Sequence, residues 1–268
     1  MSSFSINKNI KIGGKQIVLI AGPCVIENRE ICFQIAKYLK NLCQKYQIPY
    51  VFKASFDKAN RSSHKSFRGI GIEEGLIILD EVKNKFDLPV LTDIHESSHV
   101  NDVAKFADIL QIPAFLCRQT DLLEASGKTG KPINIKKGQF MAPEDMKGAI
   151  EKVRKTGNHK VMLTERGSSF GYHNLVVDMR SLMIMRELGV PVVFDATHSV
   201  QIPGGLGHAS GGQSQFVFPL ARAAAAVGID ALFLEVHPNP AKALSDGPNS
   251  VDFKNASKII KTIKAIHE

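Results

Sequence analysis

Residues 16–43 read QIVLIAGPCVIENREICFQIAKYLKNLC, a β-rich run followed by an amphipathic helical pattern. The run Gln16–Cys24 is dense in Ile, Val and Leu, which favours a buried strand. Beyond it, apolar side chains recur at the spacing of one helix face, at Ile31, Ile35, Leu39 and Leu42. The stretch therefore predicts one strand–helix unit.

The same unit recurs along the chain. Seven further β-rich runs follow, mostly with a helical pattern after each, and 268 residues shared among eight units give about 33 residues per unit, a normal strand–helix length. Eight parallel strands with right-handed helical crossovers predict an α/β fold of the (β/α)8 barrel class. The predicted runs are Gln16–Cys24, Tyr50–Phe56, Pro89–His95, Ala107–Ala114, Pro132–Lys137, Lys160–Gly167, Pro191–His198 and Ala231–Pro238.

One domain accounts for the whole sequence. Residues 1–15 predict a short N-terminal β-hairpin that plugs the barrel bottom, and residues 16–268 predict the barrel, without a linker or a second domain. The alternative fold is an open, doubly wound sheet. Because no Gly-x-Gly-x-x-Gly motif follows the first run, a dinucleotide-binding version of that sheet is disfavoured.

Composition narrows the class of protein. With 44% hydrophobic and 22% charged residues, a disordered or fibrous chain is excluded. The net charge of +8 suits an anionic partner, and because the basic residues are scattered, a small phosphorylated ligand fits as well as a polyanion. Met1–Lys8 lacks the apolar core of a signal peptide, and Phe216–Leu234 is interrupted by Arg222 and Asp230. Four cysteines are too few for a disulfide framework, so we expect a reducing, cytoplasmic location. Because the longest nearly apolar stretch carries two charges, we expect no membrane span.

Five cations stand at or just after the ends of predicted strands. In a barrel these ends meet at one mouth, and burying several cations together requires anionic partners. Two phosphates, or one phosphate and one carboxylate, would balance them. The loop Ala59–Ser63 adds hydroxyls, an amide and a guanidinium, which suit a phosphate. The five cations are Lys53, Lys58, Arg61, Lys136 and Arg166.

A second group of side chains predicts a metal site. Cys24, His198, Glu235 and Asp246 follow the first, seventh and eighth strands, and barrel closure places the eighth strand beside the first. One thiolate, one imidazole and two carboxylates suit Zn²⁺, Fe²⁺ or Mn²⁺. In the alternative interpretation Cys24 is a small core residue and the acids pair with lysines. Of the other cysteines, Cys32 and Cys43 fall on the apolar helix face and Cys117 stays open.

Motifs at the strand ends carry a family resemblance. The chain resembles 3-deoxy-D-manno-octulosonate 8-phosphate synthase from about the first strand to its end, and the combination of KANRSS with DATHSVQ is specific. The resemblance implies a (β/α)8 barrel, usually a cytoplasmic homotetramer. The implied reaction joins phosphoenolpyruvate, arabinose 5-phosphate and water and releases phosphate, on the path to the Kdo sugar of lipopolysaccharide. The motifs are AGPC, FKASFDKANRSS, TDIHE, QIPAFLCRQTDL, NIKKGQF, ERGSSFGYHNLVVDMRS, FDATHSVQ and EVHPNPAKALSDGPN.

The resemblance also implies residue roles. Asp93 would contact sugar hydroxyls, and Arg118 would reach the site of a neighbouring subunit. Catalytic roles would fall to Lys58, Asp93, His198 and Asp246. The chemistry of the reaction makes Lys58 a proton donor to the developing alkoxide, with a plain phosphate contact as the alternative. Phosphoenolpyruvate would be held by Lys53, Lys58, Gln111, Lys136 and Arg166, and the pentose phosphate by Asn60, Arg61 and Ser62.

The same family has a metal-dependent branch with Cys at the position of Cys24 and a metal-independent branch with Asn there. All four ligands of the metal-dependent branch are present, namely Cys24, His198, Glu235 and Asp246. The chain therefore resembles that branch, which implies one divalent ion, either Zn, Fe, Mn or Co.

Two other functions compete with this hypothesis. The related 3-deoxy-7-phosphoheptulosonate synthase uses erythrose 4-phosphate, but it carries a Lys-Pro-Arg-Thr type of motif where this chain has Lys58-Ala-Asn-Arg61. A non-catalytic binder of nucleic acid or another polyanion would need a basic stripe interleaved with exposed aromatics, whereas Phe and Tyr here fall mostly in apolar runs. Neither nucleic acid nor a membrane is an expected partner.

Overall fold

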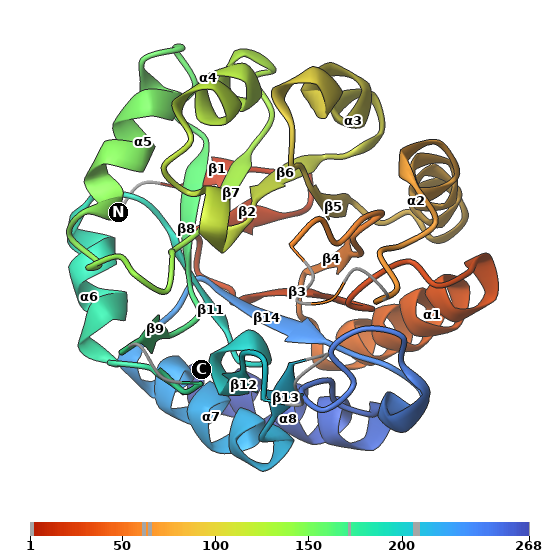
Figure 1. The fold of residues 1–268 in the computed structure, drawn as a ribbon. Coiled ribbons are helices and arrows are strands. Elements are labelled where there is room, and N and C mark those ends of the chain that lie inside the picture. The colour runs from red at the N-terminus through yellow and green to blue at the C-terminus, as the bar shows by residue number, and fades with distance from the viewer. Residues whose placement is uncertain (1–2, 61–62, 64–65, 171–172, 206–209, 268) are drawn as a thin grey trace.

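A closed barrel of eight parallel strands forms the centre of the computed structural model, which describes residues 3–60, 63, 66–170, 173–205 and 210–267 (Figure 1). In barrel order the strands are β3 (Val18–Gly22), β4 (Tyr50–Lys53), β5 (Val90–Asp93), β6 (Ile109–Ile112), β7 (Ile133–Lys136), β8 (Val161–Glu165), β11 (Val192–Asp195) and β14 (Ala231–Glu235). Each lies within one predicted run, so the (β/α)8 fold is confirmed. The open-sheet alternative is wrong, because β14 pairs with both β3 and β11.

The strands separate two apolar cores because their side chains alternate between the barrel interior and the surrounding helices. Val18 and Ile20 point inward with Phe233, whereas Leu19 and Ala21 belong to the larger core between the strands and the helices. Strands that are buried on both faces must be apolar almost throughout. This requirement explains why the eight runs were visible in the sequence.

Helices surround the barrel (Figure 1). The first one begins at Arg29 and is capped by Asn28, whose side chain accepts a hydrogen bond of 2.8 Å from the backbone of Ile31. It buries Cys32 and Cys43, as predicted. Burial raises the pKa of both thiols to about 12, which makes them inert core residues. Cys117 is also buried. The helices are α1 (Arg29–Tyr46), α2 (Ile72–Phe86), α3 (Val100–Phe106), α4 (Thr120–Lys128), α5 (Met146–Arg154), α6 (Arg180–Glu187), α7 (Val217–Val227) and α8 (Phe253–His267).

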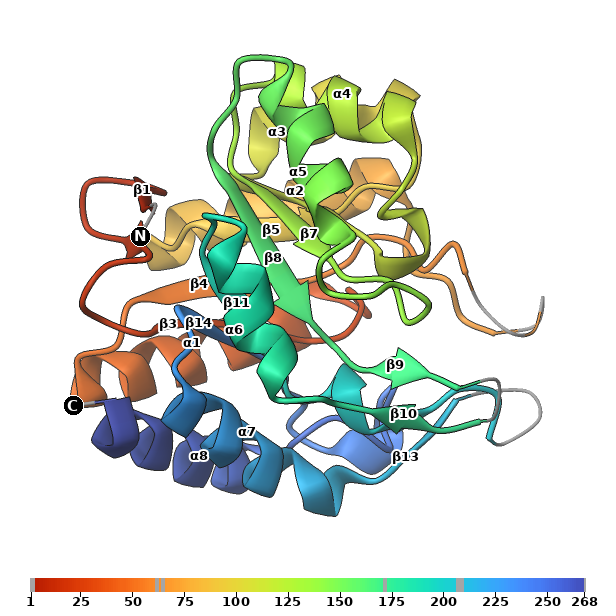
Figure 2. The same ribbon diagram turned by 90° about the vertical axis from the view of Figure 1, so that its left-hand side faces the viewer.

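An N-terminal hairpin closes one end of the barrel. Its strands β1 (Phe4–Ser5) and β2 (Lys11–Ile12) pair antiparallel, and Ile10 and Ile12 pack against the inward-facing side chains of the barrel strands. Figure 2 shows this hairpin and both chain ends on one side of the molecule, opposite the loops that follow the strands. The other end of the barrel is therefore left for the site.

Short strands and 3-10 turns lie at that open end. Two small antiparallel pairs, β9 (Ser168–Ser169) with β10 (Leu175–Val176) and β12 (Gln201–Ile202) with β13 (Gly211–Gly212), lie there (Figure 2). Single 3-10 turns η1 (Ser97–His99), η2 (Ala114–Leu116), η3 (His198–Val200), η4 (Ser214–Phe216) and η5 (Pro240–Lys242) complete the loops.

A membrane span was not expected from the sequence. In the part of the chain that the structure describes, every helix is too short or too polar to cross a bilayer.

Candidate active site

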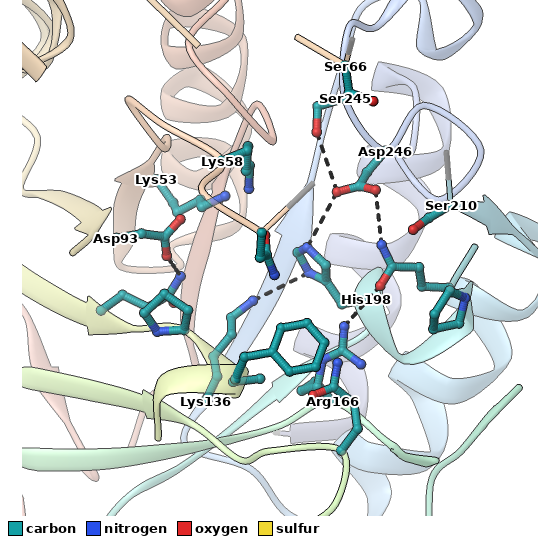
Figure 3. Close-up of a pocket in the computed structure, with 18 of the residues that line it drawn as sticks. Lys53, Lys58, Ser66, Asp93, Lys136, Arg166, His198, Ser210, Ser245 and Asp246 are labelled. Carbon is teal, nitrogen blue, oxygen red and sulfur yellow. Dashed lines mark hydrogen bonds and ion pairs between the residues drawn. The ribbon is translucent and has the colours of Figure 1, made fainter. Parts of the chain in front are cut away.

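A cavity of 350 Å³ opens at the carboxyl ends of the strands (Figure 3). Of the residues predicted for the site, Arg118 does not line it and is exposed just before α4, and Arg61 and Ser62 lie outside the described residues. Cys24 and Glu235 are not lining residues either, but both contact residues that are. The predicted residues that line the cavity are Lys53, Lys58, Asn60, Asp93, Gln111, Lys136, Arg166, His198 and Asp246.

A relay of buried polar side chains crosses four neighbouring strands on one side of this cavity. Asp93 on β5 accepts hydrogen bonds from Ser55 and from the amide of Gln111 on β6. Asn134 on β7 donates to the Gln111 oxygen at 2.8 Å and accepts at 2.6 Å from Thr164 on β8. Because the Gln111 oxygen accepts from Asn134, its NH₂ group must face Asp93, which accepts from it.

The Asp93 carboxylate is held in its charged form. Burial, the largest single effect, would raise its pKa, but the nearby positive charges, those of Lys53 and Lys58 foremost, together hold the pKa well below its usual range. A charged carboxylate at the cavity wall can accept hydrogen bonds from hydroxyl groups of a ligand.

The two innermost lysines are paired with acids at the cavity floor. Lys53 donates to Glu235 at 3.0 Å and to the carbonyl of Cys24 at 2.9 Å, while Lys136 donates to Asp195 at 2.6 Å. The ring of Phe233 lies 4.0 Å from the Lys136 nitrogen. Four of the five predicted cations, Lys53, Lys58, Lys136 and Arg166, line this cavity, and Arg61 lies outside the described residues. Of the acids in the alternative interpretation, Glu235 pairs with lysines, with Lys53 at 3.0 Å and Lys58 at 3.9 Å.

Arg166 has capacity left for a ligand. It is 4% exposed, and it donates through Nη2 to Gln201 at 3.1 Å, while its buried Nη1 has no partner among the described residues. Burial lowers the pKa of Arg166 from its usual value, against the effect of Asp195 and Asp246, but a guanidinium stays charged in proteins. A buried donor without a partner costs free energy, so this group favours an anion in the cavity.

The turn that carries Arg166 is anchored from behind. Glu165 accepts hydrogen bonds from the backbone of Arg166 at 3.0 Å and of Gly167 at 2.6 Å, and from the Ser181 hydroxyl at 2.6 Å. Lys137 lies 3.6 Å from the same carboxylate. The Arg166 backbone is thereby fixed before any ligand arrives.

The four predicted metal ligands converge at the edge of the cavity. The thiol of Cys24 donates to Asp246 at 3.1 Å, and its sulfur and carboxylate oxygens of Glu235 and Asp246 all lie within 4.8 Å of one another. The Nε2 atom of His198 lies 3.4 Å from Glu235 and 4.0 Å from Asp246. Glu235 stands opposite Gly22 across the β14–β3 pair, so barrel closure is what joins residues that are far apart in sequence.

The donor set fits a divalent cation. One oxygen of Glu235, Oε2, is buried and without a partner in the described structure, and a buried carboxylate with an unused oxygen in a group that also offers a sulfur and a nitrogen suits a metal. Burial and the negative charge of Glu235 raise the pKa of the Cys24 thiol, so a cation would be needed to bring out the thiolate. Glu235 itself is ionised, because Lys53, His198 and Lys58 lower its pKa to about 2 despite burial.

Sequence reasoning missed two residues that organise this site. Asp195 accepts hydrogen bonds from Lys136 and from His198 Nδ1, both at 2.6 Å. Gln201 joins Arg166 to Asp246, donating to the carboxylate at 3.0 Å. Both lie in the FDATHSVQ motif, and an acid at the end of a barrel strand was the signal that could have revealed Asp195.

Comparison with known proteins places this geometry among relatives. The model of the DAHP synthetase I family matches residues 2–268. A protein of Fusobacterium nucleatum subsp. nucleatum is 58% identical over 254 residues, covering 94% of this chain and 91% of the relative. One from Desulfatibacillum aliphaticivorans is 57% identical over 268 residues, covering 100% and 98%, and one from Azoarcus sp. is 58% identical over 256 residues, covering 95% and 92%. Each of the three is named 2-dehydro-3-deoxyphosphooctonate aldolase.

Proposed function

The chain belongs to the DAHP synthetase I family, and from that premise we propose that it is a transferase that makes 3-deoxy-D-manno-octulosonate 8-phosphate. Its substrates are phosphoenolpyruvate, D-arabinose 5-phosphate and water, and inorganic phosphate is released. Relatives that share 57–58% identity over nearly the whole chain support this choice over erythrose 4-phosphate and over a nucleic-acid binder. The observation that carries it is one cavity lined by three lysines and by Arg166, whose Nη1 lacks a partner among the described residues.

Phosphoenolpyruvate occupies the cationic half of the cavity. Arg166 and Lys136 hold its carboxylate and phosphate, and Lys53, Lys58 and Gln111 complete the contacts. Because these side chains are already packed and hydrogen-bonded, the anion is oriented with little further loss of conformational freedom.

The pentose phosphate lies beside it, against Asp93. The carboxylate accepts hydrogen bonds from the sugar hydroxyls, and Asn60 extends toward the phosphate at the rim. The remaining predicted phosphate contacts, Arg61 and Ser62, belong to the same loop. Two anions are thus held apart by the sugar chain while the aldehyde points at the enol carbon.

The reaction joins these groups in one sequence of bonds. Carbon 3 of phosphoenolpyruvate attacks the aldehyde carbon, water adds to carbon 2, and the carbon–oxygen bond to phosphate breaks. Lys58, 3.9 Å from Glu235, supplies a proton to the alkoxide that forms from the aldehyde. The added water gives up two protons as carbon 2 becomes a ketone, one to the deprotonated Lys58 and one to the leaving phosphate. The positive charge of Lys136 and Arg166 stabilises the phosphate as it leaves.

Cys24, His198, Glu235 and Asp246 would hold one divalent ion, as in the metal-dependent branch of the family. Zn, Fe, Mn and Co all accept this mixture of sulfur, nitrogen and oxygen ligands. When bound, the ion supplies Lewis-acid chemistry, which acidifies water or polarises the aldehyde.

A cytoplasmic homotetramer completes the proposal. Arg118 is exposed and outside its own cavity, as expected of a residue that serves a neighbouring subunit. Large apolar side chains are exposed at or beyond the ends of β6, β7 and β8, and association would bury them. They are Phe115, Phe140 and Phe170. Sedimentation velocity of the purified protein tests the assembly.

Phosphate release decides the activity. Purified protein is incubated with phosphoenolpyruvate and either arabinose 5-phosphate or erythrose 4-phosphate, before and after chelation. We expect release with arabinose 5-phosphate, much slower release with erythrose 4-phosphate, and loss of release after chelation. A preference for erythrose 4-phosphate would identify the related synthase instead, and no release with either sugar would contradict the proposal.

A further inference from the structure

We propose that Asp195 is a positioning residue whose single carboxylate serves both halves of the site: it sets the tautomer in which His198 offers Nε2 to the metal, and it holds Lys136 until an anion takes that lysine. This inference rests on the function proposed above and deepens it. It assigns a role to a side chain that touches neither substrate.

The contacts of the two Asp195 oxygens are different. Oδ1 accepts from the backbone of Thr197 at 3.1 Å and of His198 at 2.9 Å, and from the Thr197 hydroxyl at 3.0 Å. Oδ2 accepts from His198 Nδ1 at 2.6 Å and from Lys136 at 2.6 Å. The carboxylate is fully buried. One oxygen therefore anchors the turn after β11, and the other meets the two functional groups.

The contact with Nδ1 decides which nitrogen of His198 carries the proton. A carboxylate accepts only, so Nδ1 must donate, which leaves Nε2 as the nitrogen that can bind a metal. Nε2 lies 3.4 Å from Glu235 and 4.0 Å from Asp246, within the predicted ligand set. An acceptor on the second nitrogen also makes the imidazole a better ligand.

Asparagine at this position would reverse that arrangement. Its one oxygen would stay with the three donors around Oδ1, which leaves the amide NH₂ group facing His198 and Lys136. An amide N–H donates, so Nδ1 would have to accept and the proton would move to Nε2. The lysine would face a donor instead of a negative charge, and it would be released toward the cavity.

The two subsites should consequently respond in opposite directions. Asp195→Asn should weaken metal binding about 10- to 100-fold, the usual effect of losing such a partner of a ligand. Binding of phosphoenolpyruvate to the metal-free protein should stay equal or become tighter, because a negative charge beside the anion site is removed. General damage to the barrel mouth would weaken both.

The experiment measures these two affinities separately. Zn²⁺ is titrated into metal-free protein against a chromophoric chelator, and phosphoenolpyruvate binding is measured by calorimetry without metal. The matched control is Asp230→Asn. Asp230 is also buried and accepts at 2.8 Å from the backbone of Val192 on β11, but it lies at the opposite end of that strand. The control should leave both affinities within about twofold of wild type.

The outcomes separate the inference from the function. Wild-type Zn²⁺ affinity in Asp195→Asn, or a parallel loss of both affinities, would overturn the inference and leave the proposed reaction standing. Failure of the wild type to bind Zn²⁺ would overturn the metal site and the inference together, whereas phosphate release reports on the reaction by itself.

A measurement on the wild type covers the case in which Asp195→Asn does not fold. In metal-free protein with ¹⁵N-labelled histidine, the His198 signals can be assigned by comparison with His198→Gln. A proton on Nδ1 is the expected result, whether or not Nε2 carries a second one. A bare Nδ1 with the proton on Nε2 alone would overturn the inference.

Discussion

Replacing Arg166 with alanine tests the anion site most directly. The guanidinium is 4% exposed, one nitrogen donates to Gln201, and Nη1 has no partner in the described part of the chain. A ligand phosphate or carboxylate can therefore take a two-bonded fork. Charged hydrogen bonds contribute about 1.5–3 kcal/mol each, so two of them contribute about 3–6 kcal/mol.

The expected loss follows from that geometry. Removing one partner of a buried charge pair costs about 2–5 kcal/mol, and the overlap of the two ranges is about 3–5 kcal/mol. At 1.36 kcal/mol per tenfold change, kcat/KM for phosphoenolpyruvate should fall about 150- to 5,000-fold. Both KM and kcat should change, since the anion is held in the ground state and in the transition state.

Two further variants make the assay specific. Arg166→Lys keeps the charge and loses the fork, so it should recover only part of the activity. The control is Arg154→Ala on α5. This guanidinium lies away from the cavity and donates to the Gly189 carbonyl at 3.0 Å, so its removal should leave kcat/KM unchanged. The kcat/KM of each variant is obtained from initial rates of phosphate release at varied phosphoenolpyruvate concentration. Wild-type kinetics in Arg166→Ala would refute the assignment of Arg166 to the site.

Four other predictions follow from the site and the fold. Chelation should abolish turnover and Mn²⁺, Co²⁺ or Zn²⁺ should restore part of it, whereas full turnover in protein found metal-free by elemental analysis would contradict the metal site. Asp93→Asn should raise the KM for arabinose 5-phosphate. Because Lys53 and Lys58 depress the pKa of Asp93, its charge stabilises the fold above the unfolded pKa of about 4, and this contribution is lost as pH falls below that value. The stabilities of wild type and Asp93→Asn should therefore converge in acid. Equal differences in stability between the two proteins at pH 7 and at pH 3 would argue against this. Gly22→Ala should destabilise the barrel, since the added Cβ would lie 1.9 Å from the Lys53 carbonyl oxygen, and an unchanged Tm would show that β3 and β4 can move apart.

The barrel could be predicted because each of its strands has a local signature. A strand that is buried on both faces needs an uninterrupted apolar run, and Val18–Gly22 and Ala231–Glu235 both provide one. The predicted runs were too long at their carboxyl ends, where Cys24 and His237 were included. Both residues lie beyond the ends of the strands, which are Gly22 and Glu235, because the chain leaves the barrel ladder there.

The chemical types of the site residues were likewise readable, because a thiol, an imidazole, carboxylates and cations at strand ends meet at one mouth in any barrel of this kind. Cys24 and Asp246 could be grouped on that basis before their 3.1 Å contact was known. Topology alone is enough for such grouping, and topology follows from the order of the runs.

Which of these groups pair with each other was decided only by the tertiary structure. Lys53 binds one oxygen of Glu235, and the other has no partner among the residues that the structure describes. Asp195 lies between Lys136 and His198, and Arg118 lies outside the cavity of its own chain. Periodicity places a residue on a strand, but ion pairs and hydrogen bonds depend on distances of about 3 Å between side-chain atoms. Those distances are set by barrel closure and by packing between segments remote in sequence, and no local pattern encodes them.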